Sequence, residues 1–173
     1  YWRIMELDKA ISDLTIAARL NPEDLTILFN RALMYQQKGM YKEALADCDY
    51  ALKHDQDGIY TPEGNFIRAD LYFDMENYEL AVKEAKKTVK AVPTHYKALM
   101  TIGNSYLKLE NYNKAVQWYT SVLKHHPDYF LVYVKRGLTY SFKGDYKNAI
   151  SDFTLAIELH NPNDEVACLH CIY

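Results

Sequence analysis

The sequence predicts an all-α fold, an α-solenoid built from stacked antiparallel helix pairs. Two observations lead to this prediction. Apolar residues recur at helical spacing along successive segments, and the whole pattern repeats about every 34 residues. The chain has 173 residues, 49% of them hydrophobic and 25% charged, which is enough to bury a continuous core. We therefore expect one folded domain over residues 1–173.

The repeating unit is clearest in residues 128–159. In its first half Tyr133, Gly137 and Tyr140 recur at spacings of four and three, which places them on one face of a helix. Gly144 interrupts the pattern and suits the left-handed conformation that ends many helices. The second half carries its own apolar stripe, formed by Tyr146, Ala149, Ile150, Phe153, Ala156 and Ile157. Such a helical hairpin has more apolar surface than it can bury alone, so it needs a neighbour.

Earlier copies of the same unit supply that neighbour. The residues equivalent to Gly137, Tyr140, Tyr146, Ala149 and Phe153 are Gly103, Tyr106, Tyr112, Ala115 and Tyr119, then Ala69, Tyr72, Tyr78, Ala81 and Ala85, and then, after a step of 37, Ala32, Tyr35, Tyr41, Ala44 and Cys48. Ala10, Leu14 and Ala17 continue the series towards the start of the chain. The period and the pattern resemble the tetratricopeptide repeat, written W-x2-L-G-x2-Y, A-x3-F and P.

This resemblance covers essentially the whole chain. It implies a right-handed superhelix with a partial repeat at 1–24, complete repeats at 25–58, 62–95, 96–129 and 130–163, and a partial repeat at 164–173. The sequence departs from the pattern at the tryptophan position, where it has Leu28, Asn65, Leu99 and Tyr133, and at the glycine position, where it has Ala32 and Ala69. Because Tyr1 aligns inside a first helix and Tyr173 inside another, we expect a fragment of a longer protein.

The periodicity predicts a helix for each half-repeat. The expected ranges are 6–20, 24–37, 41–54, 62–74, 78–91, 95–108, 112–125, 129–142 and 146–160, with a last helix opening near 164. Pro22 and Pro127 stand just ahead of two of these helices, where a missing amide costs little. Three extra residues fall within 54–61. We interpret them as a longer solvated turn rather than a calcium loop, since Glu63 comes too early to close such a loop.

Charge and cysteine content exclude several classes of function. The formal net charge is −3, which favours neither nucleic acid nor an anionic membrane as partner. No apolar run approaches a membrane span and no leader is present, so we expect no membrane segment. An odd number of cysteines, three, indicates a reducing compartment and hence a cytoplasmic protein.

A second regularity links residues sixteen positions apart. Arg31, Arg68 and Arg136 are followed at that distance by Asp47, Glu84 and Asp152, whereas Ile102 is followed by Trp118. Basic residues thus match acids in three repeats, and an apolar pair replaces them in the fourth. We expect each pair to touch between the two helices of its repeat.

No catalytic constellation is visible, so we predict neither an enzyme nor a cofactor. Cys48 lies on a buried stripe and reads as an inert apolar thiol. The residues Cys168, His170 and Cys171 are open to two interpretations, a zinc site or a simple thiol pair on a helix, and the spacing favours the pair. His125 and His126 fit the end of a helix better than a metal or proton-transfer site. The lysines Lys83, Lys86, Lys87 and Lys90 form a basic stripe, best explained as a solvated face and otherwise as a docking patch for an acidic partner.

Function must then come from the surface of the stack. The family resemblance implies a concave groove lined by first helices that receives a peptide or a helix of a partner. The residues expected to line it are Phe29, Asn30, Leu33, Gln37, Phe66, Ile67, Asp70, Asp74, Met100, Thr101, Asn104, Lys108, Val134, Lys135, Leu138 and Phe142. Their mixture of apolar and polar types favours an amphipathic or hydrophobic segment. We therefore expect an interaction scaffold or adaptor. The alternatives are a substrate-recruiting arm of a larger enzyme, a structural segment of a cytoskeletal or ciliary assembly, or a groove filled by further repeats of the same protein.

One subfamily can be tested directly. Tetratricopeptide co-chaperones hold the C-terminal carboxylate of heat-shock chaperones with Lys and Asn, then Asn, then Lys and Arg, on three successive first helices. The equivalent residues here are Phe29 and Leu33, Ile67, and Lys97 and Thr101, or one repeat later Phe66 and Asp70, Thr101, and Leu131 and Lys135. Neither frame provides the clamp, so we do not expect a chaperone tail as ligand.

Overall fold

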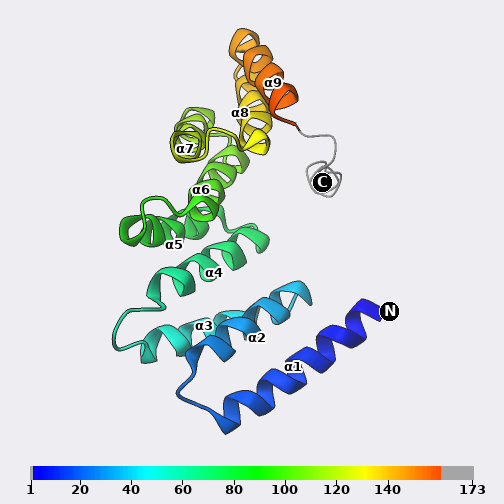
Figure 1. Ribbon diagram of the computed structural model, residues 1–173, viewed down its shortest axis with the longest axis vertical. Helices are drawn as coiled ribbons and strands as arrows, with labels where there is room; N and C mark the ends of the chain where they lie inside the picture. The colour runs from blue at the N-terminus through cyan, green and yellow to red at the C-terminus, as the bar shows by residue number, and fades with distance from the viewer. Residues whose placement is uncertain (1, 161–173) are drawn as a thin grey trace. The chain divides into compact units, whose positions relative to one another are not determined.

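Figure 1 shows the computed structural model, which describes the backbone of residues 2–160 and the side chains of residues 5–160. Every regular element in this range is an α-helix, which confirms the predicted all-α class. The chain divides into two compact units, with the division between Pro93 and Thr94. Unit 1 contains α1 (Trp2–Leu20), α2 (Leu25–Gln37), α3 (Tyr41–His54), α4 (Thr61–Asp74) and α5 (Tyr78–Ala91). Unit 2 contains α6 (Tyr96–Lys108), α7 (Tyr112–His125), α8 (Phe130–Phe142) and α9 (Tyr146–Leu159).

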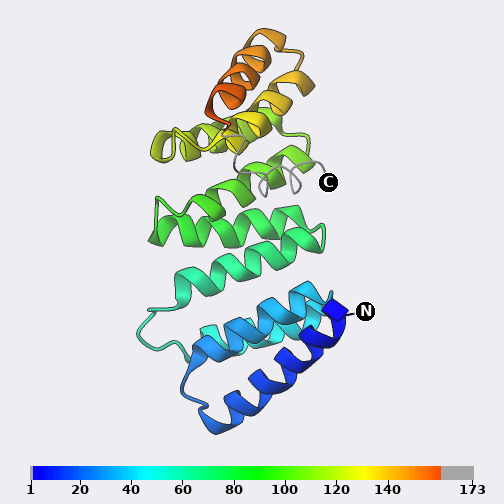
Figure 2. The ribbon, with the colours of Figure 1, turned by 45° about the vertical axis from the view of Figure 1, so that its right-hand side comes forward.

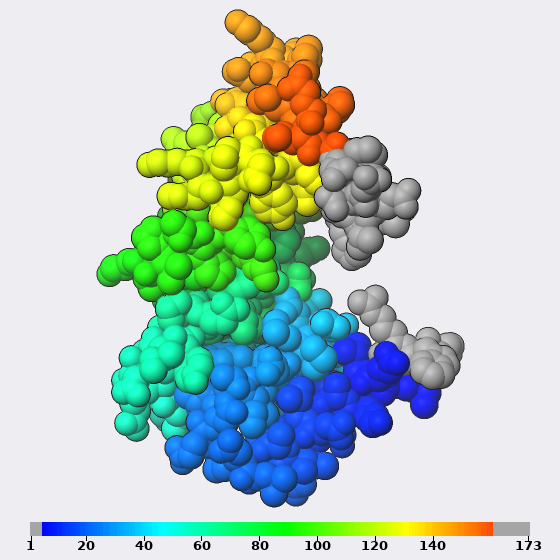
Figure 3. Space-filling view, in the orientation of Figure 1, coloured from blue at the N-terminus to red at the C-terminus, as the bar shows by residue number. Residues whose placement is uncertain are grey.

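Unit 1 is built from two hairpins and a leading helix. α2 pairs with α3 and α4 pairs with α5, while α3 also packs on α4 and α2 touches α4. α1 packs against α2, and the space-filling view in Figure 3 shows the two in direct contact. One core joins α2, α3 and α4, with Phe29, Cys48, Ile67 and Leu71 buried together. Each hairpin thus covers the apolar face of the next.

Unit 2 repeats the arrangement with two hairpins. α6 pairs with α7 and α8 pairs with α9, and α7 also packs against α8. Figures 1 and 2 both show α8 and α9 side by side. Ile102, Tyr119, Val122 and Val132 are fully buried in this unit.

The helix boundaries follow the predicted periodicity closely. Eight of the predicted helices begin and end within one residue of the observed ones, and α1 begins four residues earlier than predicted, at Trp2. Residues 161–173, with the predicted last helix near 164, lie outside the described part of the chain.

The small residues of the first helices match the side chains that face them. A Cβ atom added at Gly103 would lie 2.7 Å from the Tyr119 ring, and one added at Gly137 would lie 2.9 Å from the Phe153 ring. Both aromatic residues lie sixteen positions after their glycine. Where the first helix has alanine instead, at Ala32 and Ala69, the residue sixteen positions later is Cys48 or Ala85. The two alanine departures from the repeat pattern therefore coincide with smaller opposing side chains.

The turns within the hairpins share a left-handed residue. Gly39 and Gly144 have φ angles of 78° and 77°, as predicted for helix-ending glycines. At the equivalent positions of the two middle hairpins stand Glu76 and Glu110, with φ angles of 60° and 56°. A side chain in this conformation costs about 1 kcal/mol, so the fold requires this turn even where the sequence does not favour it.

Two of the predicted arginine–acid pairs form bidentate ion pairs. Arg31 donates through Nε and Nη2 to the Asp47 carboxylate, at 2.7 Å for each bond. Arg136 does the same to Asp152, at 2.8 and 2.7 Å. These hydrogen bonds raise the pKa of each guanidinium. Both arginines also donate to a threonine of the preceding second helix, Arg31 to Thr15 at 3.1 Å and Arg136 to Thr120 at 3.0 Å. Each arginine therefore ties three helices together.

The third predicted pair is looser. Arg68 Nε lies 3.9 Å from Glu84 and is buried without a hydrogen-bond partner. Glu84 is bonded instead by Lys87 at 2.8 Å, and Arg68 Nη1 lies 3.2 Å from Asp49, which occupies the position of Thr15 one repeat later. Arg68 therefore keeps the three-helix arrangement, although its bond to Glu84 is weak. Ile102 is fully buried, as expected for the apolar replacement, and its contact with Trp118 stays a prediction.

We expect Gly103→Ala to lower the stability of the protein by about 1–2 kcal/mol, because the added methyl group overlaps the buried Tyr119 ring. Replacing glycine by alanine in a helix normally raises the stability by about 1 kcal/mol. A loss of stability in Gly103→Ala would therefore indicate the steric overlap. Thermal unfolding followed by circular dichroism measures it, with Ala46→Gly, at an exposed position of α3, as the control for helix propensity alone. A melting temperature of Gly103→Ala equal to or above wild type would contradict the close approach.

We expect Arg136→Ala to destabilise by about 3 kcal/mol, because it leaves the Asp152 carboxylate, only 3% exposed, without its partner. The double substitution Arg136→Leu with Asp152→Leu removes both charges and should cost clearly less. Urea unfolding of the two variants gives the comparison. Equal losses would show that the pair contributes nothing specific.

Candidate functional site

The surface that the sequence singles out is formed by the first helix of each hairpin. We call it the first-helix face and describe it separately in each unit, on α2 and α4 in unit 1 and on α6 and α8 in unit 2. Residues at spacings of three, four and seven share this side of each helix. Each first helix also packs on the second helix of its own hairpin.

In unit 1 several predicted lining residues belong to the core. Phe29 and Ile67 are only 5% and 2% exposed, so their side chains offer little surface to a partner. Leu33 is partly buried against the same core, and Asn30 is exposed. Asp70 accepts a hydrogen bond from the Gln36 side chain at 3.3 Å. Gln36 also donates to Asp74 at 2.7 Å, so this part of the face is a polar network between α2 and α4.

In unit 2 the predicted residues leave apolar groups exposed. Leu138 and Phe142 on α8 are 42% and 62% exposed, and Met100 on α6 is partly exposed. Val134 lies one turn before Leu138 and lines an apolar pocket at the end of the hairpin with Phe130 and Phe153. The Asn104 side chain accepts a 2.8 Å hydrogen bond from the hydroxyl of Tyr119, whose burial raises its pKa.

The C-terminal ends of α6 and α8 lie close together. An open pocket of about 530 Å³ is lined by residues 109–113, which follow α6, and by Phe142 and Lys143 at the end of α8. The Phe142 ring stacks on the Tyr112 ring with a centroid distance of 5.9 Å and an interplanar angle of 19°. Phe142 is therefore held in place on one side and exposed on the other.

The helices of unit 2 have an unusual charge distribution. α6, α7 and α8 together contain six Lys or Arg residues and no Asp or Glu. Three of the lysines, Lys97, Lys108 and Lys135, lie on the first-helix face, and none of them forms an ion pair with another described residue. The acids nearest in sequence, Glu110 and Asp128, stand in the turns between helices. This face is therefore basic as well as apolar.

Among the described residues, the other candidate sites have local structural explanations. Within residues 5–160, no three His, Cys, Asp or Glu side chains come together as metal ligands. Asp55, in the extended turn, accepts hydrogen bonds from the Tyr60 amide and the Thr61 hydroxyl, which fits a local cap. His126 packs edge-on against Tyr96. The proposed cluster at Cys168, His170 and Cys171 lies outside the described residues.

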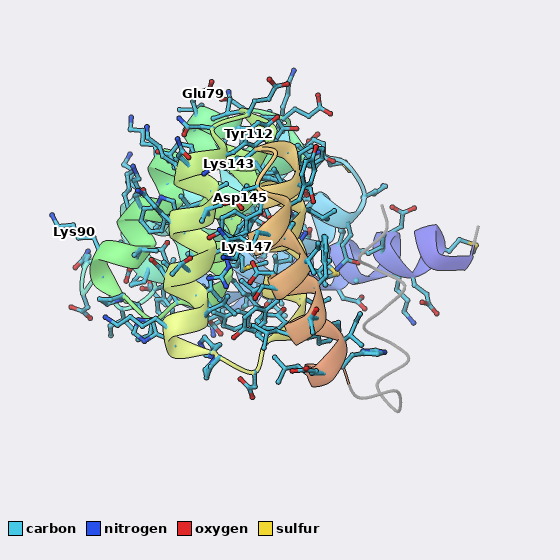
Figure 4. All side chains as sticks on the ribbon, turned by 90° about the horizontal axis from the view of Figure 1, so that it is seen from above. Glu79, Lys90, Tyr112, Lys143, Asp145 and Lys147 are labelled. Carbon is cyan, nitrogen blue, oxygen red and sulfur yellow. The ribbon has the colours of Figure 1, made fainter. Side chains whose placement is uncertain are left out.

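The lysine stripe on α5 lies on the exposed surface of this helix. All four of its lysines are exposed, and Lys87 pairs with Glu84 at 2.8 Å. Figure 4 shows Lys90 extending away from the ribbon.

Sequence reasoning missed three participants of these surfaces. Gln36 was not expected, because it lies 34 residues before Asp70 whereas these two repeats are 37 residues apart, so the two are not equivalent positions. Lys97 lies three turns before Lys108 on the same helical face, a spacing that could have placed it there. The contact of Tyr112 with Phe142 joins the first residue of α7 to the last residue of α8, and no periodic pattern in the sequence indicates it.

Comparison with known proteins agrees with this geometry. The tetratricopeptide repeat family matches residues 26–57, 96–129 and 131–162, which together make up more than half of the chain. The chain belongs to the tetratricopeptide repeat family. Residues 62–95, the remaining predicted complete repeat, lie outside these matches but form the equivalent hairpin of α4 and α5.

Solved structures of the same fold are similar over most of the chain. MamA from Desulfovibrio magneticus RS-1 has a TM-score of 0.78 at 22% identity, covering 88% of this chain and 85% of that one. YrrB, a TPR protein with an unusual peptide-binding site, has a TM-score of 0.72 at 21% identity, covering 96% and 84%. At these identities the likeness establishes the fold alone.

A curated relative is the Hsp70-Hsp90 organizing protein of Triticum aestivum. It is 28% identical over 93 residues, a region that covers 49% of this chain. The chain spans only 16% of the length of that protein. None of the described helices is long and apolar enough to cross a membrane.

We expect Cys48 to resist alkylation in the folded protein. The residue is fully buried, and burial raises the pKa of its thiol to about 12, so almost none of the reactive thiolate is present at pH 8. Iodoacetamide labelling followed by peptide mass mapping reports on each cysteine separately. Cys48 should be modified only after addition of urea, and rapid labelling without denaturant would contradict its burial.

Proposed function

We propose that this protein is a non-enzymatic interaction module, a scaffold or adaptor, that binds a peptide or an amphipathic helix of a partner protein on its first-helix face. The observation that carries the proposal is the exposure of Leu138 and Phe142 on α8. Large apolar side chains exposed together on one face typically mark a binding surface. The surface in unit 2 consists of Met100, Asn104, Lys108, Val134, Lys135, Leu138 and Phe142, with Lys97 added. In unit 1 it consists of Asn30, Leu33, Phe66 and Asp70.

The family supports this function. Tetratricopeptide domains present extended surfaces to protein partners, and such a surface is what the first helices of this chain offer. YrrB, which has the same fold, has a peptide-binding site. The absence of a catalytic constellation in the sequence agrees with a binding role.

The relation to the wheat organizing protein raises the possibility of a chaperone tail as ligand. The residues at the clamp positions argue against it. Phe29 and Ile67 are apolar and buried, and Thr101, 5% exposed, stands where the clamp needs arginine. We therefore propose a partner that is recognised through an internal segment rather than through its terminal carboxylate.

Two other roles fit the same surface. The chain could serve as the substrate-recruiting arm of a larger enzyme or as a structural segment of a cytoskeletal or ciliary assembly, and both would use the first-helix face for protein contacts. The three cysteines and the buried thiol of Cys48 favour a reducing, cytoplasmic location for either role.

We expect the double substitution Leu138→Asp with Phe142→Asp to weaken peptide binding at least tenfold, because it removes two apolar contacts from the centre of the surface. Peptides selected from a random display library on the whole chain provide the ligands. Fluorescence anisotropy then gives the dissociation constants for wild type and variant.

The matched control is Ile150→Asp, which makes the same kind of change at a residue on α9 that is 67% exposed. It should leave the affinity unchanged, and so should amidation of the C-terminus of the peptide. Equal affinity for wild type and the double variant would place the binding site elsewhere.

A further inference from the structure

We propose, building on the protein-binding role inferred above, that unit 2 selects an acidic amphipathic segment. The lysines Lys97, Lys108 and Lys135 would contact Asp or Glu side chains of this segment, and Met100, Leu138 and Phe142 would contact its apolar side chains. The partner is thus defined by its chemistry, alternating carboxylate and large apolar groups within one short stretch of a protein.

The helices of unit 2 are electrostatically complementary to an acidic partner. Along α6, α7 and α8 every charged side chain is basic, whereas the whole chain has a net charge of −3. Of the cations on these helices, Arg136 is neutralised by Asp152 at 2.7 Å. The three lysines of the first-helix face have no such partner among the described residues, so their charge remains available. Unpaired charge of one sign on a binding surface attracts and selects partners of the opposite sign.

Apolar side chains share the same helical faces as these lysines. Lys135, Leu138 and Phe142 follow one another at spacings of three and four and therefore lie along one side of α8. On α6, Met100 and Asn104 lie between Lys97 and Lys108 in the same way. A partner that satisfies both helices must carry carboxylates and apolar side chains in alternation. A purely acidic tail would leave Leu138 and Phe142 uncovered.

The same observations disfavour nucleic acid. Phosphate binding uses dense Lys and Arg contacts, and base stacking needs exposed aromatic platforms. Here Phe142, 62% exposed, offers a single aromatic ring, and the other apolar groups of this surface, Met100 and Leu138, are not aromatic.

The experiment selects ligands without assuming their sequence. A random 12-residue peptide library is displayed on phage and selected on the whole 173-residue chain. The same selection is made on a charge-reversed variant with Lys97→Glu, Lys108→Glu and Lys135→Glu. Peptides enriched by wild type should carry net negative charge together with large apolar residues, and the reversed variant should select neutral or basic peptides.

Binding measurements make the effect quantitative. For the strongest synthetic peptide we expect the charge-reversed variant to bind at least tenfold more weakly, and replacement of the peptide's Glu by Gln to cause a similar loss on wild type. The matched control variant carries Lys83→Glu, Lys90→Glu and Lys147→Glu, the same change of net charge on the exposed lysines of α5 and α9. It should bind like wild type. Circular dichroism confirms that each variant is folded.

The outcomes separate two kinds of failure. If no peptide is enriched, or if enriched peptides bind equally to Leu138→Asp with Phe142→Asp, the proposed protein-binding function fails. If binding requires Leu138 and Phe142 but the peptides show no excess of acids, or if both lysine variants behave alike, only the acidic partner is refuted. A fluorescein-labelled 20-nucleotide single strand that binds wild type as tightly as the best peptide would also refute it.

Discussion

Mutual shielding of helical hairpins is the constraint on which this structure depends. Within each unit, the second helix of a hairpin has an apolar side that cannot be buried within the hairpin itself, and the first helix of the next hairpin packs against it, α4 on α3 and α8 on α7. In unit 2, α8 packs against α7, on which Val122 is fully buried, whereas Ile150 and Ile157 on the last described helix are exposed. Burial of such side chains contributes about 1.5–3 kcal/mol each, which makes stacking the main source of stability.

Specific contacts then fix how closely and in which orientation the helices pack. Gly103 and Gly137 admit an aromatic ring against the backbone of the first helix, and Tyr119 and Phe153 provide it. Arg31 and Arg136 connect three helices through a carboxylate on one side and a threonine on the other. These contacts occupy the sides of each first helix that face its neighbours. The remaining side is the one on which we propose that a partner binds.

Much of this could be predicted from the sequence because the chain repeats itself. Equivalent positions in several copies revealed the helix boundaries and the Arg136–Asp152 pair, which a single unit would not have shown. The threonine partners of the arginines were missed, because the position that holds Thr15 and Thr120 in two repeats holds Asp49 in another. The residue type at this position therefore gives no consistent signal. Phe29 and Ile67 were expected on the surface. Helical spacing places them at the border between surface and core, and in the structure both side chains pack in the core. The left-handed backbone conformation of Glu110 could not be predicted either, because glutamate does not favour a positive φ angle.

The account of function depends on which side of the helices meets a partner. Lysine footprinting tests this most directly: the chain is acetylated with acetic anhydride, with and without a selected peptide, and each lysine is quantified by mass spectrometry. We predict that the peptide protects Lys97, Lys108 and Lys135 and leaves Lys83, Lys90 and Lys147 as reactive as before. Protection of the second-helix lysines, with those of α6 and α8 unchanged, would contradict the account.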